Sequence, residues 1–302
     1  MECPHWAPLS WHCGSRHFQI IKPQEGESSA MARPKSYLIE DLEDIVRLEV
    51  KTNPEAVRKQ GEWCGLRPGF SILDAGCGPG KVTSILYEMI QPGGCVLGVD
   101  YAEERIEHAT QQYSQKSGIG FRGLDLRDPL DAIGPFDLIW ARFVLEYNRV
   151  ESFDIVKNLS AVLKPGGALC LLDLDHNCLN HYELPPNMEQ VLLRAMRLAE
   201  EEFNFDPYSG RKLYSYLYDL GYQDIQLDLR AHHLIYGEIG DNDLFNWVMK
   251  GEIANIKAGA LFETYPGGRD AFFSDFRKFL MDPRRFIYTP LILCKGVKPF
   301  PI

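Results

Sequence analysis

Three glycines follow an acidic residue at the end of an apolar run, and a helical pattern comes directly after them. The run Ser71–Asp74 ends in the acid, and the glycines are Gly76, Gly78 and Gly80. Glycine adopts a positive φ without penalty and lets the backbone approach a ligand, while the first turn of a helix offers free N–H groups to an anion. The segment therefore predicts a cofactor-binding loop at the carboxyl edge of a parallel sheet.

Two common phosphate-binding loops do not fit this spacing. The phosphate loop G-x-x-x-x-G-K-[ST] needs glycine at 75 and Ser or Thr at 82, where the chain has Ala75 and Val82. The dinucleotide motif G-x-G-x-x-G needs glycine at 81 or 83, and these positions hold Lys81 and Thr83. The pattern that remains is Asp-x-Gly-x-Gly-x-Gly.

Two more acids follow later apolar runs. Asp100 ends a run that begins at Cys95, about twenty residues after Gly80, the interval at which such folds place a carboxylate on ribose hydroxyls. Asp125 ends a third apolar run that begins near Gly120. If these runs are neighbouring parallel strands, their ends meet at one edge of the sheet and both carboxylates lie near the glycine loop.

Taken in order, these segments resemble the class I S-adenosylmethionine-dependent methyltransferases. Asp74 to Gly80 matches the family's first motif, the run 136–147 its fourth, and 163–173, with its Pro-Gly-Gly turn, a later strand. The closest likeness is to small-molecule enzymes of the quinone-biosynthesis and natural-product type. The resemblance implies S-adenosylmethionine as cofactor. It also implies an α/β fold: a Rossmann-like, doubly wound, seven-stranded sheet, mostly parallel, with an antiparallel last strand.

The resemblance also assigns roles to individual residues. Asp125 and Leu126 correspond to adenine contacts, residues 141–143 to the edge beside the methionine part of the cofactor, and Tyr37 and Arg47 to groups near its carboxylate. An alternative for Arg47 is a solvated side chain on an amphipathic helix. The complete predicted cofactor set is Tyr37, Arg47, Asp74, Ala75, Gly76, Cys77, Gly78, Gly80, Asp100, Tyr101, Asp125, Leu126, Ala141, Arg142 and Phe143.

The methyl group of a sulfonium is already electrophilic, so alignment of the acceptor and exclusion of water supply most of the catalysis. A phenol or carbon acid would in addition need a base, and histidine titrates in the right range. The candidates are His176, His181 and His233. Each has a structural or surface role as its alternative. The first two belong to a loop, 175–182, that is expected to face the substrate.

The chain divides into four predicted parts. Residues 1–30 read as a mobile N-terminal extension and 31–66 as an N-terminal helical cap. Residues 67–236 and 284–302 form the cofactor-binding core, with its last two strands at 224–235 and 286–295. Between those strands, 237–283 has two helical patterns rich in Phe, and an insertion of this length between paired strands is usually functional. We expect a lid over an aromatic, largely apolar substrate pocket; the alternative is an inert helical pair.

Composition limits the partners. The 302 residues carry a net charge of −10, without the basic surface that nucleic acids or anionic membranes select, and no run of eighteen apolar residues occurs. The eight cysteines include no C-x-x-C pair, which favours reduced thiols and a cytoplasmic protein. Cys and His near the N-terminus match no zinc spacing, so no metal is predicted.

The sequence therefore predicts methyl transfer to an O, N or C nucleophile of a small aromatic or apolar molecule. Methylation of DNA amino groups is disfavoured because Ala141-Arg-Phe-Val stands where those enzymes have Asn or Asp before Pro-Pro and an aromatic residue. Two other classes stay open: an NAD(P)-binding oxidoreductase, and a regulatory protein that binds S-adenosylmethionine without turnover.

Overall fold

The structure is a computed structural model that describes residues 42–131 and 133–301. Its centre is a mixed sheet with the order β3-β2-β1-β4-β5-β8, and β7 pairs with the far edge of β8. The strands are β1 (Ser71–Ala75), β2 (Cys95–Asp100), β3 (Ile119–Gly123), β4 (Phe136–Arg142), β5 (Leu163–Leu174), β7 (Gln223–Ile235) and β8 (Phe286–Val297). The two-residue β6 (His181–Tyr182) pairs antiparallel with residues 286–287 of β8, before the part of β8 that pairs with β5.

The strand directions confirm the predicted fold class. β1 to β5 pair in parallel, whereas β8 runs antiparallel to both β5 and β7. The predicted last two strands are therefore present, each slightly longer than expected. The third strand differs from its prediction, because it ends at Gly123 and leaves Asp125 in the turn that follows.

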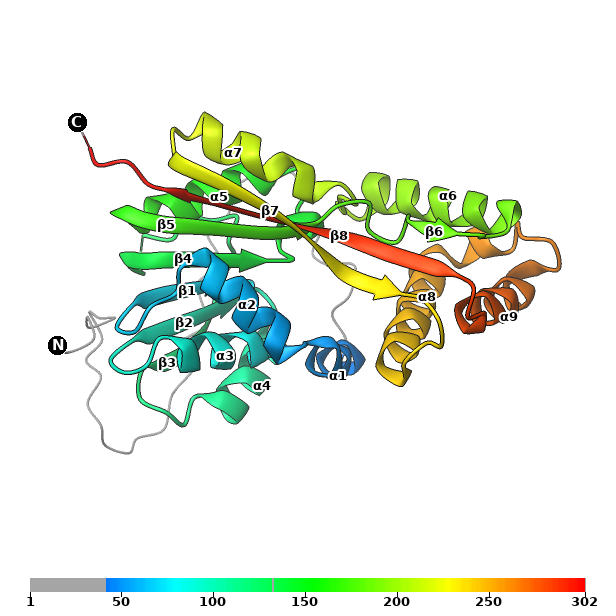
Figure 1. The fold of residues 1–302 in the computed structure, drawn as a ribbon, viewed down its shortest axis with the longest axis horizontal. Helices are drawn as coiled ribbons and strands as arrows, with labels where there is room; N and C mark the ends of the chain where they lie inside the picture. The colour runs from blue at the N-terminus through cyan, green and yellow to red at the C-terminus, as the bar shows by residue number, and fades with distance from the viewer. Residues whose placement is uncertain (1–41, 132, 302) are drawn as a thin grey trace, which may run out of the picture.

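Alternating side chains of the central strands enter two separate hydrophobic clusters, as the pleat of a strand requires. In β4, Ile139 and Ala141 join one cluster, and Leu138 and Trp140 join the other. α5 (Ser152–Ala161) and α7 (Leu213–Asp219) cover the first face, and α2 (Pro54–Cys64) and α3 (Lys81–Met89) cover the second. Helices lie on both faces of the parallel part of the sheet, which leaves the ends of those strands accessible (Figure 1). The edge strand β7 is largely exposed along its length.

Short signals set the ends of the helices near that edge. Asn53 caps α2, accepting hydrogen bonds from the backbone N–H groups of Glu55 and Ala56 at 3.0 and 3.2 Å, and Pro54 occupies the first turn. α1 (Leu42–Lys51) precedes it, and α4 (Glu103–Tyr113) follows β2. Two short 3-10 turns, η1 (Leu145–Tyr147) and η2 (Ser209–Lys212), lie beyond β4 and before α7.

The segment between β7 and β8 forms two helices at the end of the long β7–β8 pair. α8 (Asp241–Phe262) and α9 (Gly268–Met281) pack with α6 (Pro186–Glu202) around a third cluster, which contains Trp247, Phe262, Phe272, Phe276 and Phe279. Figure 1 shows α8 beside α1, and residues of the two helices are in contact. Most of the aromatic side chains that predicted a substrate pocket are thus packed against one another.

Candidate functional site

The glycine loop after β1 requires glycine at two of its positions for steric reasons. Gly76 and Gly80 have φ values of 73° and 94°. A Cβ on Gly76 would lie 2.4 Å from Cγ2 of Val144, and one on Gly80 would lie 2.8 Å from Cβ of Ala109. The loop therefore packs closely against the segment after β4 and against α4, which leaves its other side for a ligand.

Asp100 at the end of β2 holds this loop in place. Its Oδ2 accepts a hydrogen bond from the backbone N–H of Gly78 at 2.9 Å, and its Oδ1 accepts one from Ala102 at 3.0 Å. The Arg105 guanidinium lies 3.9 Å from Oδ1. A carboxylate oxygen can accept two hydrogen bonds, so the carboxylate keeps acceptor capacity for the hydroxyls of a ligand.

Asp74 lies behind the loop rather than in the cavity. The side chain is 2 % exposed, and its Oδ2 accepts a 2.6 Å hydrogen bond from the hydroxyl of Thr83 in α3. Burial raises the pKa of Asp74 from 3.8 to about 7, although the Thr83 hydrogen bond and Arg142 oppose the rise. Asp74 therefore ties the strand end to the next helix.

A cavity opens at the carboxyl edge of the sheet, where β1, β2 and β4 end. Nine of the predicted cofactor residues line it: Arg47, Gly76, Cys77, Gly78, Asp100, Tyr101, Leu126, Arg142 and Phe143. Five others lie outside the lining: Asp74, Ala75, Gly80, Asp125 and Ala141. Tyr37 falls outside the described residues.

Asp125 is engaged in its own turn. Its carboxylate forms a two-point ion pair with the Arg127 guanidinium, with N···O distances of 2.8 Å to Nε and 2.6 Å to Nη2, and it also accepts the backbone N–H of Arg127. The neighbouring Leu126 reaches the cavity. The adenine contact assigned to Asp125 stays a prediction, and it would use the acceptor capacity that Arg127 leaves.

Phe143 marks the other side of the cavity. It follows β4 with φ 60°, a left-handed conformation that is uncommon for a bulky residue and is associated with functional sites. The Arg142 guanidinium lies 3.9 Å from the centre of its ring, the Lys51 ammonium 5.4 Å, and the His232 ring 4.8 Å. The sequence reasoning missed Lys51 and His232. For Lys51 a signal was available, because it stands four residues after Arg47 and so shares its helix face.

Two buried acids, Asp173 and Glu146, lie at the end of β5 and in η1. Asp173, at the end of β5, accepts hydrogen bonds at Oδ2 from the backbone N–H groups of Leu145 and Glu146 at 2.9 and 3.1 Å. The Glu146 carboxylate accepts a 2.8 Å hydrogen bond from the Asn177 amide. Burial raises the pKa of both acids, and nearby Lys51 opposes the rise at Glu146.

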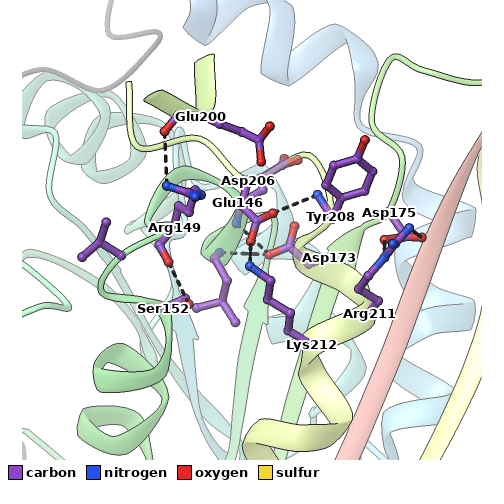
Figure 2. A network of polar contacts seen from close by, with 12 residues as sticks. Glu146, Arg149, Ser152, Asp173, Asp175, Glu200, Asp206, Tyr208, Arg211 and Lys212 are labelled. Carbon is purple, nitrogen blue, oxygen red and sulfur yellow. Dashed lines mark hydrogen bonds and ion pairs between the residues drawn. The ribbon is translucent and has the colours of Figure 1, made fainter. Parts of the chain in front are cut away.

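Polar contacts join η1, the end of β5 and η2 (Figure 2). The Arg211 guanidinium binds the Asp175 carboxylate at 2.7 and 3.0 Å, and Lys212 pairs with Asp206. The backbone N–H of Asp206 donates to the carbonyl of Glu146 at 2.7 Å. Asp175, which was expected to face the substrate, is thus paired with η2.

None of the three candidate histidines lines the cavity. The His176 ring packs on Tyr208 at 5.0 Å, and the His181 ring lies 5.3 Å from that of Trp247, where burial lowers the pKa of His181 to about 4. His233 is 8 % exposed, and burial lowers its pKa to about 2. A catalytic role for any of them stays a prediction.

The helical insertion touches the core through polar groups. The Arg47 guanidinium, 2 % exposed, donates to Oδ1 of Asn246 in α8 at 3.3 Å. The amide nitrogen of the same Asn246 lies 3.4 Å from Nε2 of His233. Within 42–131 and 133–301, no group of three or more His, Cys, Asp or Glu side chains is arranged to hold a metal ion. Over the same residues, no helix is long and apolar enough to cross a membrane.

The residues around the cavity fit S-adenosylmethionine. The backbone of the glycine loop lets the cofactor approach closely, the Asp100 carboxylate offers an acceptor to its ribose hydroxyls, and the buried Arg47 guanidinium offers a donor to its carboxylate.

Comparison with known proteins agrees with this geometry. Residues 72–167 match a family described as a methyltransferase domain. The demethylmenaquinone methyltransferase of Lactococcus lactis is 33 % identical over 118 residues, 38 % of this chain and 46 % of that protein. The chain thus spans less than half the length of that relative.

Solved structures show the same fold at low sequence identity. A candidate methyltransferase of Bacillus halodurans superposes with a TM-score of 0.54 at 16 % identity, covering 82 % of this chain and all of that one. Phosphoethanolamine N-methyltransferase 2 of Haemonchus contortus, in complex with S-adenosylmethionine, gives 0.51 at 14 % identity, covering 85 % of this chain and 57 % of that one. Residues 72–167 are therefore similar to a methyltransferase domain, and the chain shares the fold of these solved structures.

Proposed function

We propose that the protein transfers a methyl group from S-adenosylmethionine to an O, N or C nucleophile of a small molecule. The observation that carries this proposal is the meeting of the Gly76–Gly80 loop, the Asp100 carboxylate and the Arg47 guanidinium around one cavity at the carboxyl edge of the sheet. Among glycine-loop cofactors, this set of contacts suits an adenosyl amino acid, since Lys81 and Thr83 stand where a dinucleotide-binding loop has its last glycine.

When bound, S-adenosylmethionine supplies an electrophilic methyl group on a sulfonium. The protein then has to bind, orient and exclude water. In this proposal Asp100 accepts from the ribose hydroxyls, Arg47 binds the methionine carboxylate, and Arg142 and Phe143 border the place where the acceptor meets the methyl group.

Residues 237–283 are proposed as the lid of the acceptor site, above a cofactor-binding core formed by 67–236 and 284–302. The Arg47–Asn246 hydrogen bond supports this role, because it joins a cavity residue to the insertion. We also propose a reducing, cytoplasmic environment, since all six cysteines in the described part of the chain are free thiols.

The test begins with binding. Isothermal titration with S-adenosylhomocysteine, S-adenosylmethionine and NADH should show binding of the first two only. Transfer of tritium from methyl-labelled S-adenosylmethionine to phenols, quinones and amines then tests turnover. Binding of NADH alone would refute the proposal in favour of an oxidoreductase. Tight binding of S-adenosylmethionine, with no transfer to a broad acceptor set, would favour a regulatory protein.

A further inference from the structure

α1 lies over the cofactor cavity but is not part of the hydrophobic core. Four residues of α1 and of the turn after it line the cavity: Arg47, Leu48, Lys51 and Thr52. A Cβ on Gly78 would lie 3.7 Å from Cδ1 of Leu48, so the helix packs directly over the glycine loop.

In the part of the chain that the structure describes, no α1 side chain belongs to any of the three hydrophobic clusters. Ile45 is buried outside them, and Val46 and Val50 are 56 % and 41 % exposed. An element with little apolar burial is drawn from the less stable parts of a fold. Polar contacts therefore have a large share in holding α1 over the cavity.

Glu49, on the side of α1 that faces α3 and α4, makes several such contacts. Its carboxylate accepts a hydrogen bond from the hydroxyl of Tyr113, at 3.0 and 3.1 Å to its two oxygens. The ammonium of Lys81 lies 3.9 Å from Oε2 and also donates to the backbone carbonyl of Glu49. Nε2 of His108 lies 3.7 Å from Oε1. One side chain thus joins α1 to the start of α3 and to α4.

The contacts of Glu49 differ in strength. The side chains of Glu49, Lys81 and His108 are 24 %, 28 % and 31 % exposed, and solvent weakens ion pairs at such distances. The Tyr113 hydroxyl donates to a charged acceptor, which makes a stronger bond. Burial and the Glu49 charge both raise the pKa of Tyr113, so its hydroxyl remains a donor. The Tyr113–Glu49 hydrogen bond is therefore the principal contact of this group.

Tyr113 also lies next to the glycine loop. A Cβ on Gly80 would lie 3.0 Å from Cδ2 of the Tyr113 ring. The ring therefore packs beside the loop while its hydroxyl holds Glu49. Through this one residue, the position of α1 is connected to the loop that would contact the cofactor.

The opposite side of α1 is held by α8. Arg47 donates to Oδ1 of Asn246 at 3.3 Å, and α1 lies between α4 and α8 (Figure 1). Glu49 follows Arg47 by two positions, a rotation of about 200° around the helix. A helix that covers a cavity and is held by polar groups on two sides can open when one side is released.

We propose that Glu49 is a positioning residue: it holds α1 closed over the cofactor cavity through Tyr113, and release of this contact lets the cofactor leave. Glu49 itself lies outside the cavity lining, so it acts on the cofactor through Arg47 and Leu48. The inference rests on the proposed function for the identity of the cofactor, whereas the contact that holds α1 can be tested without it.

The first test compares two ligands that share adenosine. S-adenosylhomocysteine carries the amino-acid part that Arg47 is proposed to bind, and adenosine lacks it. Glu49→Ala should weaken binding of S-adenosylhomocysteine about tenfold, mainly through faster dissociation in stopped-flow measurements. Its affinity for adenosine should change by less than about twofold. General damage to the fold would instead weaken both ligands alike.

Graded variants identify the contact. Tyr113→Phe removes only the hydroxyl and should speed dissociation of S-adenosylhomocysteine about fivefold. Glu49→Gln keeps an oxygen that accepts this hydroxyl and should fall between wild type and Glu49→Ala. The double variant Glu49→Ala/Tyr113→Phe should dissociate no faster than Glu49→Ala, because both changes remove the same bond. Glu107→Gln, an exposed change on α4, is the control and should have no effect.

Amide hydrogen exchange of the full chain without ligand tests the contact independently of any cofactor. Exchange over 42–51 should be faster in Glu49→Ala than in wild type, while exchange in β1 stays the same. Thermal unfolding shows which variants are folded, and Tyr113→Phe replaces Glu49→Ala in every comparison if the latter is not.

Three results would overturn the inference: unchanged exchange over 42–51, equal dissociation of S-adenosylhomocysteine from wild type and the folded variant, or an equal loss of affinity for both ligands. Failure of wild-type protein to bind S-adenosylhomocysteine would instead refute the proposed function. The exchange measurement would then still decide whether Glu49 holds α1.

Discussion

Asp100 accepts a 2.9 Å hydrogen bond from the backbone N–H of Gly78, so the carboxylate expected to bind ribose also fixes the glycine loop. One residue thus shapes two neighbouring parts of the cofactor site. Its other oxygen holds the start of α4 through Ala102.

Replacement of Asp100 should therefore weaken cofactor binding, and the loss should be larger with Ala than with Asn. Asp100→Asn keeps one oxygen acceptor but presents an NH₂ group to a backbone N–H, and we expect about tenfold weaker binding of S-adenosylhomocysteine by titration. Asp100→Ala loses both hydrogen bonds, and we expect still weaker binding with a lower melting temperature. Glu107→Gln, an exposed change of the same charge on α4, serves as the control. Equal affinity of Asp100→Ala and wild type would contradict this role.

The glycine loop allows steric overlap to be separated from backbone strain. Gly76→Ala combines a positive φ with a 2.4 Å contact to Val144, whereas Gly69→Ala has φ 85° and open space around the new methyl group. We expect Gly69→Ala to cost about 1–2 kcal/mol in unfolding free energy without affecting S-adenosylhomocysteine binding. Gly76→Ala should cost more and should impair binding.

Adding Val144→Ala to Gly76→Ala should restore part of the lost stability, because the nearest remaining Val144 atom, Cβ, would be 3.6 Å away. Chemical denaturation of the two single variants and the double variant gives the coupling energy. Additive losses would show that the overlap with Val144 is not the cause.

The raised pKa of Asp74 predicts a specific pH dependence of stability. Between about pH 4 and 7 the unfolded chain ionises Asp74 while the folded protein keeps it protonated, so this residue lowers the unfolding free energy as pH rises. The loss is complete above about pH 7 and amounts to about 4 kcal/mol. Asp74→Asn lacks this titration.

Urea unfolding is measured from pH 4 to 8. The wild type should lose stability relative to Asp74→Asn between about pH 4 and 7, and should lose no more above about pH 7. Most other titrating groups cancel in the difference between the two proteins. A difference that does not vary with pH would contradict the raised pKa.

The contact between Arg47 and Asn246 predicts how firmly α8 is held against α1. Asn246→Ala removes the acceptor and the contact with His233, a loss of about 1 kcal/mol that should raise the population of locally opened α8 about fivefold. Amide hydrogen exchange over 241–262 measures the change. Asn242→Ala, an exposed substitution on the same helix, should leave exchange unchanged. Identical exchange in both variants would show that the contact does not restrain α8.

The core of the fold could be predicted because its signals are local. The buried run before Asp74 and the glycines after it specify a strand and a tight turn within a dozen residues, and Asp100 repeats the pattern one strand later. The antiparallel last pair could be predicted from alternation within 224–235 and from the family resemblance.

Other features depend on contacts between distant segments. Arg47 and Asn246 are 199 positions apart in the sequence, yet they form a hydrogen bond. The Phe rings of 262–279 pack mainly in one hydrophobic cluster, so their number did not indicate a substrate pocket. A histidine pair gave no local indication of which ring would approach Phe143. The ring of His232 lies beside Phe143, at the point where the pairing of β7 with β8 shifts register between Ala231 and His233.

The position of the insertion at the tip of the β7–β8 hairpin has an evolutionary consequence. Both ends of 237–283 are anchored in adjacent antiparallel strands, so the segment can be lengthened, shortened or replaced as a cassette without breaking the order of the parallel strands that carry Asp74 and Asp100. Exchange of this cassette would therefore change the side chains that meet α1, such as Asn246, while the strands that carry Asp74 and Asp100 stay in place.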